Sequence, residues 1–243
     1  MTTATLTHLS DASLASSMDH LIAARRNLLK GIQSTPAVQS LVSGQPNPAD
    51  YKRYLINVWH YARHSATVIA LAGSRCVSTH PELANYLFHH AREELGHEQW
   101  ALEDLATLGV APADVFDTQP LPSCAAMVGY EYYIAGHANP VGIFGWLYIL
   151  EAMGEDLGPT ISAQLSKVFS NGTGTRFVRA HGEADELHTR DLTEQITTHI
   201  GRADMTHVNH VADVVSQLYL GIFQQLPHGS GNHDHADTQG RGS

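Results

Sequence analysis

Apolar residues recur along this chain at spacings of three and four positions, which is the period of an amphipathic helix. In the first such segment, Met18, Leu21, Ile22, Leu28 and Leu29 fall on one side of a helix. No run alternates apolar and polar residues for long enough to predict a β-strand. The pattern therefore predicts an all-α fold.

Capping and breaking residues give the expected helix boundaries. Asn47 before Pro48 is typical of a helix start, and Thr79 before Pro81 repeats the signal. Gly158 and Pro159 are expected to end the most apolar helix. The predicted helices cover residues 11–32, 36–42, 48–73, 79–108, 122–136, 141–157, 175–199 and 204–226. Short turns join them, so we expect a single bundle of seven to eight helices.

The C-terminal segment 228–243 differs from the rest of the chain. It is rich in Gly, His and Asp and has almost no apolar residue, so burial cannot offset the entropy of ordering it. We expect a folded domain over residues 1–227 and a disordered tail over 228–243.

Composition excludes several classes of protein. The chain has 14 Lys and Arg against 24 Asp and Glu, a formal net charge of −10 at pH 7, and no basic cluster that would bind nucleic acid. Cys76 and Cys124 are too few for a disulfide framework or a thiolate metal site. Neither a secretion signal nor a membrane-spanning apolar run is present. We therefore expect a cytoplasmic protein with no nucleic-acid or membrane partner.

Three side chains suited to metal binding fall on one face of a predicted helix. His181, Asp185 and His188 are separated by four and seven positions, which places them within about 60° of one another around the helix axis. The same spacing also occurs on ordinary solvated helix faces. Phe177, close to the same face, favours a partly buried position for this group.

A second pair, Glu94 and His97, has the Glu-x-x-His spacing from which helical bundles build carboxylate-bridged dinuclear metal sites. The motif alone is weak, and His90, four positions before Glu94, blurs it further. Gly96 is disfavoured inside a helix, so we expect another group to approach the backbone closely there.

Glu151 is the most informative acid because it lies in a strongly apolar helix. A carboxylate in such surroundings must be paired, protonated or bound to metal. The plainer alternative is a hydrogen bond to a tyrosine such as Tyr130 or Tyr148.

Taken together, these segments offer three carboxylates and three imidazoles. Such mixed oxygen and nitrogen ligands suit Fe(II) or Mn(II). Six ligands fit two metal ions better than one, although a mononuclear site with some of the six in supporting positions stays open. The predicted ligands are Glu94, His97, Glu151, His181, Asp185 and His188.

In order and spacing these residues resemble the ligand pattern of the heme-oxygenase-like diiron oxidases and oxygenases. The matching motifs are Glu94-Leu-Gly-His97, Glu151-Ala-Met-Gly-Glu155 and His181-x-x-x-Asp185-x-x-His188, and the resemblance spans residues 48–226. The ferritin-like pattern fits less well, since it needs a second Glu-x-x-His.

This resemblance implies a heme-oxygenase-like bundle that holds two Fe ions, Fe(II) or Fe(III), and uses O2 as co-substrate. Glu94 and His97 would hold one side, Glu151 would bridge, and the other three ligands would complete the site. The implied reaction is C–H cleavage, C–C scission or N-oxygenation of a small amino-acid-derived or carboxylic-acid substrate in a biosynthetic pathway. The resemblance leaves room for an electron donor and for a homodimer.

The helix that carries Trp59, His60, Tyr61 and His64 would line the cavity of such a bundle. Ordinary core packing explains the two aromatic residues equally well. Five residues are further candidates to support the ligands or bind a substrate carboxylate, namely His60, His64, Arg63, Arg92 and Arg179.

Three other functions stay open from the sequence. A true heme oxygenase would use an N-terminal histidine such as His20 as the iron ligand. A metal-independent, thiaminase-like enzyme on the same fold would need Cys124 as nucleophile, although a buried inert thiol is the simpler interpretation. A non-enzymatic scaffold bundle would hold no iron.

Overall fold

The computed structural model describes residues 11–169 and 173–226, with side chains from residue 18 onward, apart from those of 183 and 184. The described residues form ten α-helices and a short 3-10 turn and contain no strand, which confirms the all-α prediction. The helices are α1 (Asp11–Gln33), α2 (Pro36–Val42), α3 (Pro48–Cys76), α4 (Pro81–Glu93), α5 (His97–Thr107), α6 (Pro112–Phe116), α7 (Pro122–His137), η1 (Pro140–Gly142), α8 (Ile143–Val168), α9 (Arg176–His199) and α10 (Arg202–Gln224). The expected disorder of residues 228–243 concerns a segment outside the described residues.

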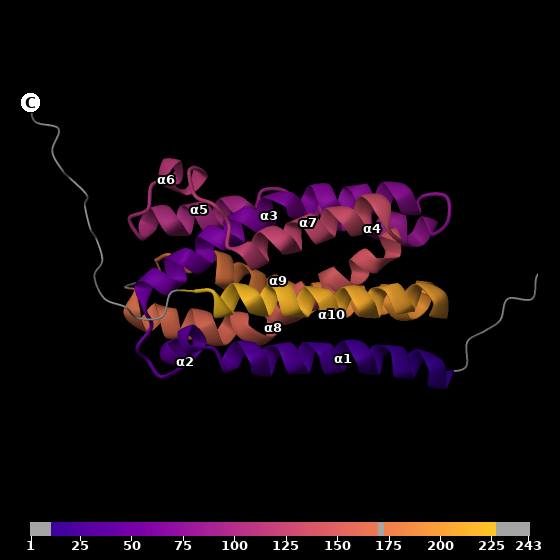
Figure 1. Cartoon of the computed structure of the whole chain (residues 1–243), viewed down its shortest axis with the longest axis horizontal. Helices are drawn as coiled ribbons and strands as arrows, with labels where there is room; N and C mark the ends of the chain where they lie inside the picture. The colour runs from indigo at the N-terminus through magenta and orange to yellow at the C-terminus, as the bar shows by residue number, and fades with distance from the viewer. Residues whose placement is uncertain (1–10, 170–172, 227–243) are drawn as a thin grey trace, which may run out of the picture.

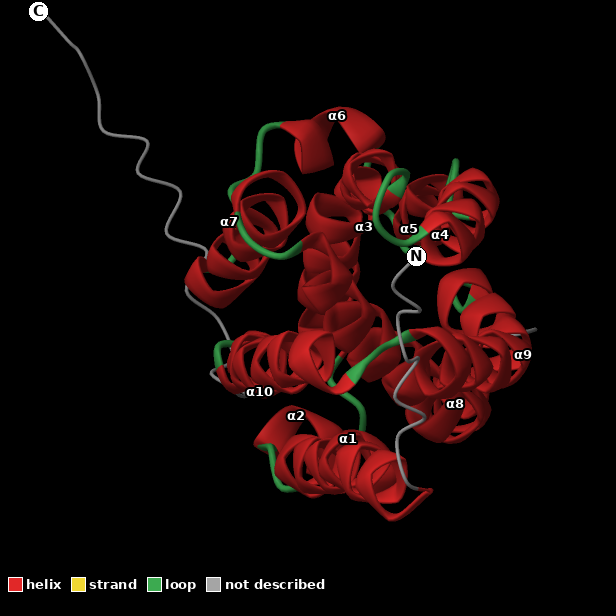
Figure 2. Ribbon diagram, turned by 90° about the vertical axis from the view of Figure 1, so that its right-hand side faces the viewer, coloured by secondary structure: helices red, strands yellow, loops and turns green. Residues whose placement is uncertain are grey.

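The helices stack in three layers. Helix α1 and the short α2 form one edge, α8, α9 and α10 form the middle, and α3 with α4, α5 and α7 forms the other edge (Figures 1 and 2). Helix α8 packs most extensively on α9, and α3 packs on α4, α5 and α7. Segments far apart in sequence therefore meet where α4 and α5 face α8 and α9.

Of the capping residues predicted at Asn47, Thr79 and Asp204, the structure confirms Asn47 alone. The side chain of Asn47 accepts a hydrogen bond from the backbone N–H of Ala49 at 2.9 Å, with Pro48 in the first turn, as expected. His80, not Thr79, precedes the first residue of α4. Asp204 lies in the first turn of α10, after Gly201, and accepts a hydrogen bond from Asn139 at 2.7 Å.

The structure has more helices than the seven to eight predicted. The segment 79–108 is two helices because the chain turns at Gly96, where φ is +91°. A Cβ at Gly96 would meet nothing within 4 Å, so the left-handed backbone conformation explains this glycine, and the close approach expected there was wrong. The short α6 adds another helix in a stretch where none was expected.

Helix α8 continues through Pro159 to Val168, whereas the sequence predicted an end at Gly158. Proline in a helix interior removes a backbone hydrogen bond, at a cost of about 3 kcal/mol. Packing of α8 on α9 compensates for this loss. A Cβ on Gly158 would lie 2.7 Å from the Cα of Gly182, so the two glycines let the helix backbones touch.

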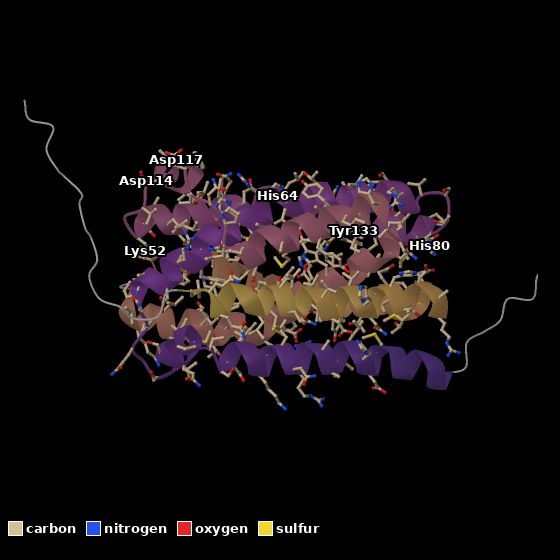
Figure 3. The ribbon with its side chains drawn as sticks, in the orientation of Figure 1. Lys52, His64, His80, Asp114, Asp117 and Tyr133 are labelled. Atoms are coloured by element: carbon tan, nitrogen blue, oxygen red, sulfur yellow. The ribbon has the colours of Figure 1, made fainter. Side chains whose placement is uncertain are left out.

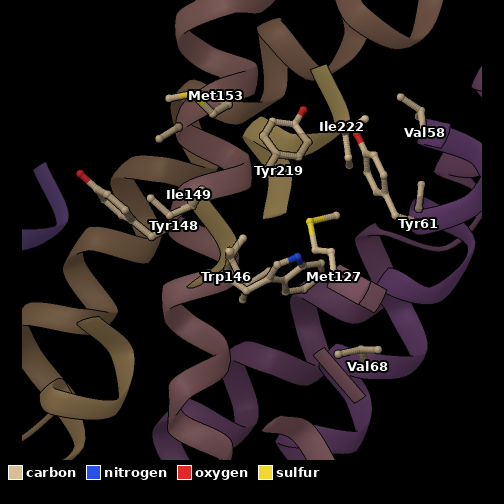
Figure 4. Packing of buried hydrophobic residues seen from close by; sticks show 14 of the residues in the cluster. Val58, Tyr61, Val68, Met127, Trp146, Tyr148, Ile149, Met153, Tyr219 and Ile222 are labelled. Carbon is tan, nitrogen blue, oxygen red and sulfur yellow. The ribbon is translucent and has the colours of Figure 1, made fainter. Parts of the chain in front are cut away.

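The core is apolar and continuous across the layers. Figure 4 shows Tyr61 of α3, Trp146 of α8 and Tyr219 of α10 coming from different helices into one region of the interior. No helix among the described residues is both long and apolar enough to cross a membrane.

Glu131 of α7 lies in this core, 1% exposed. Neither of its carboxyl oxygens makes a regular hydrogen bond to the described residues. Burial raises the pKa of Glu131 well above its usual value, and the indole of Trp146 lowers it only in part. Burial therefore favours the neutral form of this carboxyl group in the folded chain.

A pH dependence of stability follows from this raised pKa. In the unfolded chain Glu131 loses its proton above about pH 4.3, whereas the folded chain keeps it. Between that pH and the pKa of the folded state, Glu131 therefore lowers the free energy of unfolding by about 1.4 kcal/mol for each pH unit. Glu131→Gln keeps the shape and is neutral at every pH. Urea denaturation of the metal-free protein between pH 5 and 8 should show a less steep decline for the variant. Parallel curves for the two proteins would show that Glu131 is already ionised in the folded state.

Candidate metal centre

The turn between α4 and α5 places Glu94 and His97 side by side. Glu94 follows the last residue of α4, and its N–H donates to the carbonyl oxygen of His90 at 3.0 Å. His97 begins α5, and its Nδ1 lies 3.2 Å from Oε1 of Glu94. The ring of Trp100 stacks on the His97 ring with centroids 4.1 Å apart, which fixes its orientation. The Glu-x-x-His pair is therefore presented by a helix break and not by one continuous helix.

Glu151 of α8 lies between imidazoles from two other helices. Its Oε1 is 3.0 Å from Nε2 of His90 on α4, and its Oε2 is 3.2 Å from Nδ1 of His188 on α9. Burial alone would raise the pKa of Glu151, but hydrogen bonds from the two imidazoles hold it below its usual value. The hydrogen bond to Glu151 raises the pKa of His188 in turn. The partners of Glu151 are therefore two histidines and not the tyrosine considered from the sequence.

His181 is oriented for metal binding by its own helix. Its Nδ1 lies 3.0 Å from the carbonyl oxygen of Phe177. Because a carbonyl oxygen only accepts, Nδ1 carries the proton and Nε2 keeps a lone pair for a metal ion. Burial lowers the pKa of His181, which favours this neutral form. Its ring lies 5.0 Å from that of His97, measured between centroids.

These side chains form two groups that could each hold a metal ion. The ligand atoms within each group lie within 4.8 Å of one another. The three-residue cluster is Glu94, His97 and His181, and the four-residue cluster is His90, Glu94, Glu151 and His188. Glu94 belongs to both, whereas Glu151, for which the resemblance implied the bridging role, belongs to the four-residue cluster alone. Carboxylates and imidazoles without a thiolate suit Fe(II) or Mn(II), so the residues present fit an iron pair.

The structure thus brings five of the six predicted ligands into the two clusters, with Asp185 beside them. Asp185 is 3% exposed, and its Oδ1 lies 4.0 Å from Nδ1 of His188. Burial, and then the neighbouring Glu151, raise the pKa of Asp185 to about 11. Its place as a metal ligand stays a prediction.

His90 is the ligand that the sequence did not assign. It is 1% exposed and contacts Glu151 directly. Its position one helical turn before Glu94 was the available signal. That spacing alone could not show that α4 turns this face toward α8 and α9.

A cavity of about 80 Å³ adjoins the clusters. Glu94, Glu151, His181 and Asp185 form its polar side. Most of the other side chains that line it are apolar or aromatic. Tyr61 of α3 contributes to the wall, as expected, whereas Trp59 packs against Phe116 outside it.

None of the additional candidates predicted on α3 and elsewhere lines this cavity among the described residues. Nε2 of His60 lies 2.8 Å from the hydroxyl of Thr118. His64, labelled in Figure 3, has its Nδ1 3.1 Å from the Tyr132 hydroxyl of α7. Three exposed arginines lie elsewhere, namely Arg63, Arg92 and Arg179. The structure therefore does not support a role in substrate binding for these five residues.

The residues needed by two alternative functions also lie outside the cavity. His20 is on the surface of α1, with Nε2 3.0 Å from Oδ1 of Asp213. Cys124 is fully buried, and burial raises the pKa of its thiol to about 12, which disfavours a nucleophilic thiolate.

Asp104 of α5 ties the start of α9 to the helix that carries His97. It is 2% exposed and accepts hydrogen bonds from the backbone N–H groups of Arg176 and Phe177 at 2.9 and 2.8 Å. These are two of the donors that a helix leaves unpaired at its N-terminus. The contact fixes His181, one turn further along α9, relative to His97.

Asp104→Ala should lower the free energy of unfolding by about 1–3 kcal/mol, because two buried N–H groups lose their acceptor. The matched control is Glu103→Ala, at the preceding position, where an exposed ion pair with Arg176 is lost at a cost of at most about 1 kcal/mol. Denaturant unfolding of both variants measures the difference. Equal losses would show that Asp104 does not cap α9.

Comparisons with known proteins give the family and the fold of this chain. The family described as iron-containing redox enzymes matches residues 52–219. A domain of unknown function with a heme oxygenase-like fold from Shewanella denitrificans is similar in structure, with a TM-score of 0.78, 26% identity and coverage of 90% of this chain and 93% of that one. No curated protein matches the sequence.

Two TenA homologues are also similar in structure. The one from Pseudomonas syringae pv. tomato has a TM-score of 0.72 and 15% identity, over 86% of this chain and 91% of that one. The one from P. horikoshii has a TM-score of 0.71 and 17% identity, over 86% of this chain and 96% of that one. At these identities the likeness shows a common heme oxygenase-like fold alone.

Proposed function

Because the chain belongs to the family of iron-containing redox enzymes, we propose that it is an O2-activating non-heme diiron oxidase or oxygenase. Its substrate is a small amino-acid-derived or carboxylic-acid molecule, oxidised at a C–H, C–C or nitrogen centre, and an electron donor completes the reaction. The observation that carries this proposal is the pair of ligand clusters, built from buried and half-buried side chains, that share Glu94.

The two clusters divide the ligands between two iron ions. His97 and His181 would hold one ion with Glu94, and His90, Glu151 and His188 would hold the other with the same Glu94. When bound, the iron pair supplies the electrons that reduce O2. The protein's own part is to fix the ligands, to keep water out through the apolar wall of the cavity, and to hold a proton on the Asp185 carboxyl beside them until metal binds.

Anaerobic titration with Fe(II), followed by exposure to O2, tests this function. The full chain is expected to bind two equivalents of Fe(II), to consume O2 faster than free Fe(II) does, and to show a transient visible absorption. The same chain loaded with Zn(II) is the control and should consume none. O2 uptake at the rate of free Fe(II) would contradict the proposal.

The same sample separates the remaining alternatives. Hemin titration that gives stoichiometric binding with a sharp Soret band would favour a heme oxygenase, although His20 pairs with Asp213 and does not line the cavity. A chain that binds neither iron nor hemin would favour a scaffold or a metal-independent enzyme.

A further inference from the structure

A second, smaller compartment lies directly behind the cavity that adjoins the metal clusters. It measures about 40 Å³ and is lined by residues of α2, the start of α3 and the C-terminal parts of α8 and α10. These four segments meet at the left-hand end of the molecule in Figure 1. The two compartments share Tyr54, Ile161 and Phe223 as a common wall.

This shared wall consists of side chains from three different helices. The rings of Tyr54 and Phe223 lie 5.4 Å apart between centroids, and Ile161 completes the partition. Side-chain rotations are far less costly than movements of the helix backbone, so rotation about the side-chain bonds of these residues can join the two compartments.

The cavity that adjoins the metal clusters is the first compartment. Apart from the candidate metal ligands, the polar groups that line it are all neutral. The hydroxyls of Tyr54, Tyr61 and Tyr219 hydrogen-bond among themselves, and burial raises the pKa of each, so all three are neutral at pH 7. Among the described residues, no Lys or Arg lines either compartment. Asp50 at the start of α3 lines the second compartment and does not favour an anion there.

Burying a charged group without a partner of opposite charge is costly, whereas each buried methylene is favourable. Val38 and Leu41 of α2 and Leu165 of α8 offer an apolar surface of this kind in the second compartment. A negatively charged substrate side chain therefore finds no group of opposite charge in either compartment away from the metal ligands, whereas an apolar chain fits both.

We propose that the second compartment binds an uncharged, apolar tail of the substrate, which passes between Tyr54, Ile161 and Phe223 while the reacting end lies beside the metal clusters. The substrate is thus a molecule with an alkyl or aryl chain, and not an amino acid with an acidic side chain. The assignment of this tail to a substrate rests on the proposed function, but the binding of an apolar chain does not require iron.

Calorimetric titration of the metal-free full chain with 1-butanol, 1-hexanol, 1-octanol and 1-decanol tests the compartment. Affinity is expected to rise about three- to fourfold for each added methylene, the equivalent of about 0.8 kcal/mol, until both compartments are filled. L-Glutamate, whose side chain ends in a negative charge, should bind at least tenfold more weakly than 1-hexanol.

Ala37→Trp places an indole at the half-buried edge of the second compartment. The variant should bind 1-decanol at least tenfold more weakly and 1-butanol as the native chain does. The matched control, Ile22→Trp, puts the same side chain at an exposed position of α1 and should leave both affinities unchanged. If Ala37→Trp does not fold, Ala37→Phe narrows the same space with a smaller ring.

The proposal would be overturned if the Ala37→Trp variant bound 1-decanol as tightly as the native chain does. It would also be overturned if the variant lost as much affinity for 1-butanol as for 1-decanol. The result is separate from the test of the proposed function. A chain that consumes O2 with iron but shows no dependence on alcohol length would keep the diiron function and overturn the tail compartment. A chain with the expected length dependence and no O2 consumption would keep the compartment and remove the diiron function.

Discussion

Glu94→Ala should bind almost no iron, whereas the native chain binds two equivalents. Glu94 supplies a carboxylate oxygen to both ligand clusters, so its removal leaves His97 with His181 on one side and takes a ligand from the other. An expected loss of about 100-fold or more in Fe(II) affinity at each position follows, since loss of a supporting partner alone costs 10- to 100-fold. Anaerobic Fe(II) titration with analysis of bound iron measures it.

Two matched variants show whether the effect belongs to the shared ligand. Glu93→Ala removes a more exposed carboxylate at the preceding position and should keep two equivalents of iron. His181→Ala removes a ligand of the three-residue cluster alone, so it should keep one tightly bound iron. Retention of two irons by Glu94→Ala would show that this residue is not common to the two positions.

Gly154→Ala should disrupt the site with no change to a ligand. A Cβ on Gly154 would lie 1.6 Å from Oδ2 of Asp185, which is an impossible contact, so α9 or the Asp185 side chain must move. We expect a decrease of about 1–3 kcal/mol in the free energy of unfolding, typical of an overpacked interior. Iron affinity should fall at least tenfold, because His181 and His188 lie on the same helix as Asp185.

Gly129→Ala is the control for the Gly154 prediction. Gly129 also lies within a helix, α7, but a Cβ there would meet nothing within 4 Å. Alanine should stabilise this helix by up to about 1 kcal/mol and leave iron binding unchanged. Thermal unfolding and Fe(II) titration of the two variants in parallel provide the comparison. Unchanged iron affinity in Gly154→Ala would mean that Asp185 is free to move without effect on the ligands.

The helical period predicted most of the architecture, because an apolar stripe on each helix must be buried against another element. The predicted helix ends were wrong at two positions. The structure ends a helix near Gly96, where none was predicted to end, and continues a helix through Pro159, where one was predicted to end. At Gly96 a left-handed glycine turns the chain within an apparently continuous pattern. At Pro159 contact between α8 and α9 keeps a helix that local preference would end.

The candidate site was predictable where ligands repeat on one helix face. Spacing placed His181 and His188 on one helix face, although the structure puts them in different clusters. An apolar context marked Glu151 as buried. His90 could not be assigned, because its contact with Glu151 depends on how α4 packs against α8. The cavity was beyond sequence analysis for the same reason, since its walls come from helices far apart in the chain.

The most direct test of the central claim is the position of iron in crystals of the full chain grown with Fe(II) in the absence of O2, located by anomalous diffraction at the iron absorption edge. The account predicts two iron peaks on either side of Glu94. One should contact His97 and His181, and the other should contact His90, Glu151 and His188. A single iron peak, or iron bound away from Glu94, would contradict it.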